Sequence, residues 1–281
     1  MRRLWKGGKR VSFYLTKYGA CLWQGRFSGF EVPGLLHAVS TRFGGVSKQP
    51  FSSMNLALHT GDDAEAVLKN RKIFCQALGV SAERICTPEQ VHGDRIFRVT
   101  QKDAGRGSRV YSDAISGTDA LITNEKNIPL MLCFADCTPI LLFDPVHAAI
   151  GIAHGGWRGT VQKIAQKTLL AMGQAFGSRA EQCIAAIGPS IGPCCYVVGQ
   201  EVAEAFAKAF PQQQEQILQS CSGQIHLNLW MANRLQLEEI GMVSERIECA
   251  DTCTACNSGL FFSYRAEGGT TGRIAAVLSL V

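Results

Sequence analysis

Three closely spaced apolar runs constrain the fold of this chain more than any other feature. They span residues 128–134, 140–143 and 148–153. Short, continuous apolar runs bounded by turn signals are typical of strands that are buried on both faces. Cys137 follows the first run and His154 follows the last. We therefore expect a thiol and an imidazole at neighbouring strand ends.

The rest of the chain mixes strand and helix patterns without strict alternation. Helical spacing of apolar residues, together with start and stop signals, predicts helices over 61–78, 161–176, 199–210 and 228–240. Further strands are expected before residue 41 and at 96–99, 120–123, 184–187 and 273–280. Because the chain has no repeat, linker or composition break, we expect one α+β domain with mixed β-sheets.

Charge and composition narrow the class of protein. The net charge is +5, and the first ten residues account for all of it, with Arg2, Arg3, Lys6, Lys9 and Arg10. A frayed basic terminus explains this charge, so nucleic-acid binding is not expected. No signal peptide is recognised, and no run reaches the ~18 apolar residues of a membrane helix. We expect a cytoplasmic protein without membrane contact, whose twelve cysteines remain reduced.

His92, Cys137 and His154 are the strongest candidates for chemistry. A cysteine and two histidines suit a zinc ion with an open coordination position. Cys137 and His154 could instead form a nucleophile and its base. The same residue types also bind copper in electron-transfer sites. A multicopper oxidase needs many histidines, however, and this chain has only six, with no His-x-His pair.

Polar residues near these candidates suggest supporting roles. Asp136 precedes Cys137 and could orient a ligand histidine or cap a turn. His154 is followed by Gly155-Gly156 and Arg158 at the start of a predicted helix, which could bind an anion. Arg42 and Arg265 lie beside glycine pairs and could contact phosphate.

The remaining cysteines give a weaker signal. Cys253 and Cys256 form a single Cys-x-x-Cys, and Cys249 lies nearby. A structural zinc site would need a second such pair, and the adjacent Cys194 and Cys195 lack that spacing. A redox or metal role for these thiols is left open.

Six motifs in order resemble the YfiH family, which is also described as a laccase-domain family. The resemblance runs from about residue 35 to the C-terminus and rests on PEQVHG (88–93), TDALIT (118–123), ADCTPILLFD (135–144), GIAHGGWRG (151–159), IGPSIGPCCY (187–196) and FFSYRAEGGTTG (261–272). It implies a catalytic domain over residues 35–281, with residues 1–34 as a basic segment and first strands of the same domain. The implied fold has α/β/β/α layers and is similar to a toxin deamidase with a cysteine hydrolase-like fold.

The resemblance also implies an activity. Family members bind zinc through residues that fall on His92, Cys137 and His154. They cleave adenosine, inosine, guanosine and methylthioadenosine with phosphate, giving the free base and ribose 1-phosphate, and they deaminate adenosine. Cys137, His154 and Asp136 would then be catalytic, and Arg42, Asn55, Arg158 and Arg265 would bind substrate or phosphate. The resemblance does not specify the preferred nucleoside or the oligomeric state.

Three other functions compete with this one. A Cys137–His154 pair could cleave an amide in a cell-wall precursor, because one branch of the family is named peptidoglycan editing factor. A copper-dependent polyphenol oxidase is less favoured, with copper in place of zinc. A zinc-stabilised binding module without activity is disfavoured, because a structural zinc site is usually closed by a fourth protein ligand.

Overall fold

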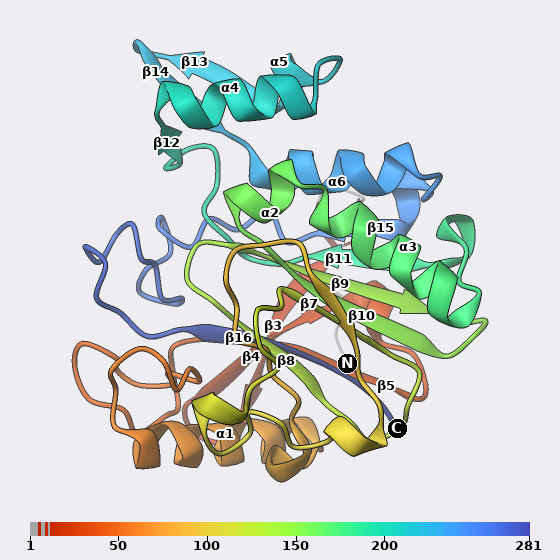
Figure 1. Ribbon diagram of the computed structural model, residues 1–281. Helices are drawn as coiled ribbons and strands as arrows, with labels where there is room; N and C mark the ends of the chain where they lie inside the picture. Colours follow the sequence, from red (N-terminus) through yellow and green to blue (C-terminus); the bar gives the residue numbers. More distant parts are fainter. Residues whose placement is uncertain (1–4, 7–8, 11) are drawn as a thin grey trace.

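Two β-sheets packed face to face form the centre of the molecule in the computed structural model, which describes residues 5–6, 9–10 and 12–281 (Figure 1). The six-stranded sheet has the order β15-β11-β9-β10-β7-β6. Its strands are β6 (Ile96–Arg98), β7 (Ala120–Thr123), β9 (Thr138–Asp144), β10 (Ala149–Gly155), β11 (Ile184–Ile187) and β15 (Ile247–Cys249). This sheet is mixed, because β6 runs parallel to β7 and β11 runs parallel to β15, whereas its other pairs are antiparallel.

The second, five-stranded sheet is antiparallel and has the order β3-β4-β5-β16-β8. Its strands are β3 (Phe13–Tyr18), β4 (Leu22–Phe27), β5 (Leu35–Ser40), β8 (Leu130–Phe134) and β16 (Ile274–Leu280). Apolar side chains of both sheets form one core cluster between them, including Val39, Leu132, Leu141, Ile152 and Leu278.

The three apolar runs become β8, β9 and β10, and every residue of these strands is buried. β9 and β10 pair as antiparallel neighbours, with His154 opposite Pro139. β8 instead lies in the five-stranded sheet beside β16. The chain therefore crosses between the sheets at residues 135–137, and Cys137 stands at this crossing.

Helices cover the outer faces of the two sheets. α1 (Ala64–Leu78) packs on the five-stranded sheet and lies at the bottom of Figure 1. Asp63 accepts a hydrogen bond from the Glu65 backbone at the start of α1, and Gly79 ends it in a left-handed conformation. α3 (Ile164–Phe176) and α6 (Leu229–Glu239) cover the six-stranded sheet. The layers are thus α/β/β/α, as predicted.

The helix expected to run on from the Gly155-Gly156 turn is broken in two. α2 (Trp157–Val161) ends before Lys163, whose φ of 64° is left-handed, and α3 then begins. Gln236 of α6 accepts the backbone N–H of Ala165 at 3.1 Å. The first N–H groups of a helix have no partner within the helix. The Gln236 side chain supplies a partner for one of these groups at the start of α3.

A small layer projects beyond α6 at the top of Figure 1. It contains β12 (Val197–Val198), α4 (Gln200–Ala209), α5 (Gln214–Ile217), β13 (Leu218–Cys221) and β14 (Gln224–Leu227). Phe206, Phe210, Ile217 and Leu227 form its apolar centre. The glutamine-rich segment 212–224 supplies α5 and β13.

The N-terminal segment contributes two antiparallel strands of two residues each, β1 (Trp5–Lys6) and β2 (Lys9–Arg10). Arg2 and Arg3, on which the expectation of a frayed basic terminus partly depends, lie outside the described residues. Within the described ranges, no helix has the length and apolar character needed to cross a membrane.

Candidate active site

His92, Cys137 and His154 come together, as the sequence predicts. Their potential ligand atoms lie within 4.8 Å of one another. Cys137 immediately precedes β9 and His154 is close to the end of β10, and the antiparallel register places them side by side. The ring centroids of His92 and His154 are 4.8 Å apart. His154 is buried, whereas His92 is exposed.

Asp119 holds both histidines in place. Its carboxylate accepts the backbone N–H groups of Val91, His92 and Gly93 at 3.1, 3.0 and 2.8 Å. These bonds fix a loop in which His92 has a left-handed φ of 61°. Asp119 Oδ1 also lies 2.8 Å from His154 Nδ1, so Nε2 of that ring is left for the cluster.

Sequence reasoning did not assign a role to Asp119. The available signal was an acid directly before the buried strand β7, within the motif of residues 118–123. The expectation that Asp136 orients a ligand histidine is corrected, because Asp119 makes that contact. Asp136 instead accepts the Thr254 hydroxyl at 2.6 Å and the Arg265 backbone N–H at 2.7 Å. It joins the strand crossing to two C-terminal loop segments.

Gly156 allows the side chains of His92 and Cys137 to lie close to the backbone at the start of α2. A Cβ atom at this position would lie 3.1 Å from His92 Cδ2 and 3.2 Å from Cys137 Sγ. Such contacts are tighter than ordinary van der Waals distances, so a side chain here would displace the ligand groups. Gly156 is also the N-cap of α2, which explains the strand–glycine–helix pattern.

The electrostatics of the cluster favour a thiolate beside an imidazolium. Burial alone would raise the pKa of Cys137, but His154 and His92 lower it to about 6. Burial would lower the pKa of His154, but Cys137 and Asp119 raise it to about 9. Burial likewise opposes ionisation of Asp119, yet His154 and the Gly93 and Val91 backbone N–H groups lower its pKa.

The cluster opens into a pocket of about 490 Å³, a size common for sites that bind small molecules. Besides the cluster, the pocket wall includes His59, Tyr196, Tyr264, Arg265 and Arg273. The guanidinium of Arg265 lies over the Tyr196 ring, and that of Arg273 lies over the Tyr264 ring. Of these five residues, the sequence reasoning proposed only Arg265.

The other predicted substrate residues lie elsewhere. Arg42 forms an ion pair of 3.0 Å with Glu267 and stacks over Phe262. Asn55 is buried, where it bonds to Thr60 and Asp62 and accepts the Arg273 backbone N–H. Arg158 is exposed and stacks on Trp157. Their predicted role in binding substrate or phosphate stays a prediction.

The donor set fits a metal ion. One thiol and two imidazoles suit zinc and also copper. Among the described residues, the cluster offers three ligand side chains, those of His92, Cys137 and His154, and all three line the pocket. A metal ion held here would thus keep a position for a non-protein ligand, which is the arrangement of a catalytic rather than a structural zinc site.

Comparisons with known proteins show the family to which this chain belongs. The family model described as multi-copper polyphenol oxidoreductase laccase matches residues 36–281. Purine nucleoside phosphorylase YlmD of Geobacillus stearothermophilus is 40% identical over 246 residues, covering 87% of this chain and 90% of the relative. Adenosine deaminase RL5, from an unknown prokaryotic organism, is 34% identical over 240 residues, covering 85% and 91%.

Two solved structures have the same fold as this chain. The crystal structure of YlmD from Geobacillus stearothermophilus superposes with a TM-score of 0.89 at 37% identity, covering 95% of this chain and 98% of that one. YfiH of Bacillus licheniformis superposes with a TM-score of 0.88 at 35% identity, covering 92% and 96%. The predicted α+β fold class is confirmed, and the likeness to a toxin deamidase stays a prediction.

Proposed function

This chain belongs to the multi-copper polyphenol oxidoreductase laccase family of enzymes, and we propose that it is a purine nucleoside phosphorylase. Its reaction would convert adenosine, inosine, guanosine or methylthioadenosine and phosphate into the free base and a ribose 1-phosphate. One observation carries the proposal. The His92–Cys137–His154 cluster opens into a pocket whose wall also contains two arginines and two tyrosines.

The pocket wall offers partners for both substrates. Arg265 and Arg273 supply guanidinium groups, which bind phosphate oxygens through directed hydrogen bonds. Tyr196 and Tyr264 supply aromatic surfaces for the purine or the ribose. Phosphorolysis forms a bond from a phosphate oxygen to the anomeric carbon while the bond to the base breaks. Holding phosphate and nucleoside together in one pocket is thus a large part of the catalysis.

Zinc is the proposed metal, held by His92, Cys137 and His154. When bound, it would supply Lewis-acid activation of a water molecule or a substrate oxygen, which also suits the deamination of adenosine. Asp119 keeps the ring of His154 in one orientation, and Gly156 leaves room for the ligand groups. Copper is less favoured, because a multicopper oxidase needs many histidines and this chain has six, with no His-x-His pair.

A product assay tests the proposal. Protein of known metal content is incubated with adenosine, with and without phosphate, and the products are separated by chromatography. Adenine and ribose 1-phosphate that appear only with phosphate would support phosphorolysis. Inosine formed regardless of phosphate would place deamination first. A zinc-loaded sample that forms neither product would overturn the proposal.

One observation favours a second function. Cys137, His154 and Asp119 stand in the order nucleophile, base and orienting carboxylate, as in cysteine hydrolases. Such an enzyme would cleave an amide, for example in a cell-wall precursor. Metal removal separates the two functions. The phosphorylase would lose its activity with the metal, whereas a Cys–His hydrolase would keep or gain activity when Cys137 is free.

A further inference from the structure

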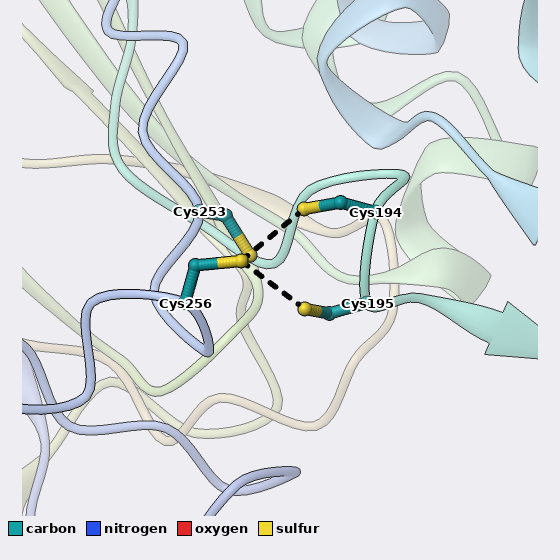
Figure 2. Close-up of side chains that lie close together, drawn as sticks. All are labelled: Cys194, Cys195, Cys253 and Cys256. Carbon is teal, nitrogen blue, oxygen red and sulfur yellow. Dashed lines mark hydrogen bonds between the residues drawn. The ribbon is translucent and has the colours of Figure 1, made fainter.

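Four cysteines gather at a second place in the molecule, and none of them is among the residues that line the pocket. Cys194 and Cys195 come from the loop after β11, and Cys253 and Cys256 come from the loop after β15 (Figure 2). Their sulfur atoms all lie within 4.8 Å of one another. Cys256 Sγ is 3.5 Å from Cys194 Sγ and 3.3 Å from Cys195 Sγ. All four thiols are free.

A turn explains how adjacent cysteines face one centre. Successive side chains of an extended strand point to opposite sides, so a Cys-Cys pair in a strand could not supply two ligands to one site. Here the backbone N–H groups of Cys195 and Tyr196 both bond to the Gly192 carbonyl at 3.0 Å. The chain turns back over these residues, and both sulfur atoms point toward Cys256, as Figure 2 shows. This turn lets the pair face one centre without the Cys-x-x-Cys spacing that such a site usually has.

Filling of the apolar core does not account for this cluster. The cysteines that serve as small apolar residues, such as Cys75, Cys86 and Cys183, are fully buried. In the four-cysteine group, by contrast, Cys194 and Cys256 are exposed and Cys195 is half-buried.

Cys253, the buried member, has a polar partner. It accepts the backbone N–H of Gly192 at 3.2 Å. Backbone N–H groups directed at a sulfur atom stabilise a thiolate, which is the form that binds metals.

From this arrangement we propose that Cys194, Cys195, Cys253 and Cys256 bind a second zinc ion in a closed, structural tetrathiolate site. Zinc–sulfur bonds of ~2.3 Å in a tetrahedron place sulfur atoms about 3.8 Å apart, which is close to the spacing found here. Four thiol ligands leave no position for water or substrate. Binding of the ion displaces the thiol protons, so the four sulfur atoms share a divalent charge instead of repelling one another as anions.

The second ion would fix one wall of the pocket. Its two loops connect directly to the strand crossing that carries Cys137. The Thr138 hydroxyl donates to Ser190 at 3.0 Å, and the Thr254 hydroxyl donates to Asp136 at 2.6 Å. Ile191 and Tyr196, in the same loop as Cys194, line the pocket. The site thus joins two chain segments about 60 residues apart in sequence. Holding such distant segments together costs conformational entropy, which zinc binding would offset.

The variant His92→Ala tests the inference without altering the four cysteines. It is purified under reducing conditions, its zinc is counted, and the zinc coordination is measured by X-ray absorption. We expect one zinc per chain, surrounded by four sulfur atoms at about 2.3 Å. A zinc-free sample, or a coordination shell that contains nitrogen, would overturn the inference. Iron–sulfur absorption in place of zinc would overturn the choice of metal.

A second set of variants identifies the ligands. Cys194→Ser/Cys195→Ser should bind one zinc fewer per chain than the unmodified protein. Cys221→Ser, which changes an exposed cysteine on β13, should bind the same amount as the unmodified protein. Equal zinc in the double variant would contradict the inference. A disulfide from Cys256 to Cys194 or Cys195 in protein kept reduced, detected by mass spectrometry after alkylation, would contradict it as well.

Discussion

The two clusters of potential metal ligands, the pocket cluster and the four-cysteine cluster, differ in their side chains and in their surroundings. The pocket cluster combines Cys137 and His154, at strand ends, with His92 from a loop, and it opens into a cavity of about 490 Å³. The four-cysteine cluster comes from two loops and contains only thiols. For the two proposed metal sites, the number and type of ligands and the adjoining space separate the reactive site from the structural one.

Support for the ligands differs as well. Asp119 makes four contacts to the pocket cluster and its loop, through three backbone N–H groups and the His154 ring. The four-cysteine cluster relies on the Gly192 backbone N–H, which donates to Cys253, and on the turn that the Gly192 carbonyl closes. Support from a residue directly before a buried strand suits a site where geometry controls reactivity.

Replacement of a pocket ligand should have the largest effect. We expect Cys137→Ala to lower kcat/KM for phosphorolysis by at least about 100-fold, because even the loss of a residue that only supports a ligand costs 10–100-fold. It should also remove one zinc per chain. Steady-state kinetics and metal analysis check both, with Cys221→Ser as the matched cysteine control. Full activity of Cys137→Ala would remove the basis for calling this cluster the reaction centre.

Asp119→Asn should have the next largest effect. Asparagine has a similar shape but lacks the charge that supports His154, so we expect a loss of about 10- to 100-fold in zinc affinity or kcat/KM. Asp144 provides a matched control, because it lies 2.7 Å from His147 Nδ1 and accepts the Val146 backbone N–H. It stands at the opposite end of β9 from Cys137. Comparable losses in Asp119→Asn and Asp144→Asn would indicate a general effect on folding.

Gly156→Ala should weaken the pocket cluster to a smaller extent. The added Cβ meets His92 and Cys137, and overpacking of this kind typically costs about 1–3 kcal/mol. That corresponds to about 5- to 150-fold in zinc affinity, which competition with a chelating dye measures. Gly199→Ala is the matched control, since Gly199 is also a helix N-cap with nearly the same φ and has no atom within 4 Å of an added Cβ. Equal zinc affinity in both variants would contradict the steric argument.

Acid should weaken the fold itself through a residue outside both clusters. Burial and the charge of Arg26 lower the pKa of His37 from 6.5 to about 3. Between these values the unfolded chain binds a proton that the folded chain does not, so stability falls as pH decreases from 6.5 toward 3. The contribution approaches about 1.4 kcal/mol per pH unit.

His37→Gln should reduce this slope of stability against pH, because glutamine can still accept the Phe27 backbone N–H but does not titrate. Urea unfolding of metal-free protein at several pH values measures the slope without acid-driven loss of zinc. The same slope in both proteins would show that His37 does not set the acid limit.

Much of the fold could be predicted where one segment carries its own signal. The buried strands β9 and β10 follow from continuous apolar runs, and α1 follows from apolar spacing between Asp63 and Gly79. The placement of β8 in the other sheet could not be predicted, because strand pairing depends on distant partners such as β16. The left-handed Lys163 that separates α2 from α3 has no local sequence signal.

The candidate site was predictable to a similar degree. His92, Cys137 and His154 were recognisable from residue type and position. Asp119 resembles any acid at a strand start until its contacts are known. Arg42 is a loop arginine beside glycines, as a phosphate ligand can be, yet its partner Glu267 is distant in sequence. The four-cysteine cluster needed the turn at Gly192, which spacing rules do not include.

Anomalous X-ray diffraction at the zinc edge, from crystals of protein purified under reducing conditions, tests the contrast between the clusters most directly. The account predicts two peaks. One should lie among His92, Cys137 and His154 with a non-protein fourth ligand, and the other should lie among the four cysteines with sulfur at every position. A single peak, a fourth protein ligand at the pocket, or a sulfur–sulfur bond in the second cluster would contradict it.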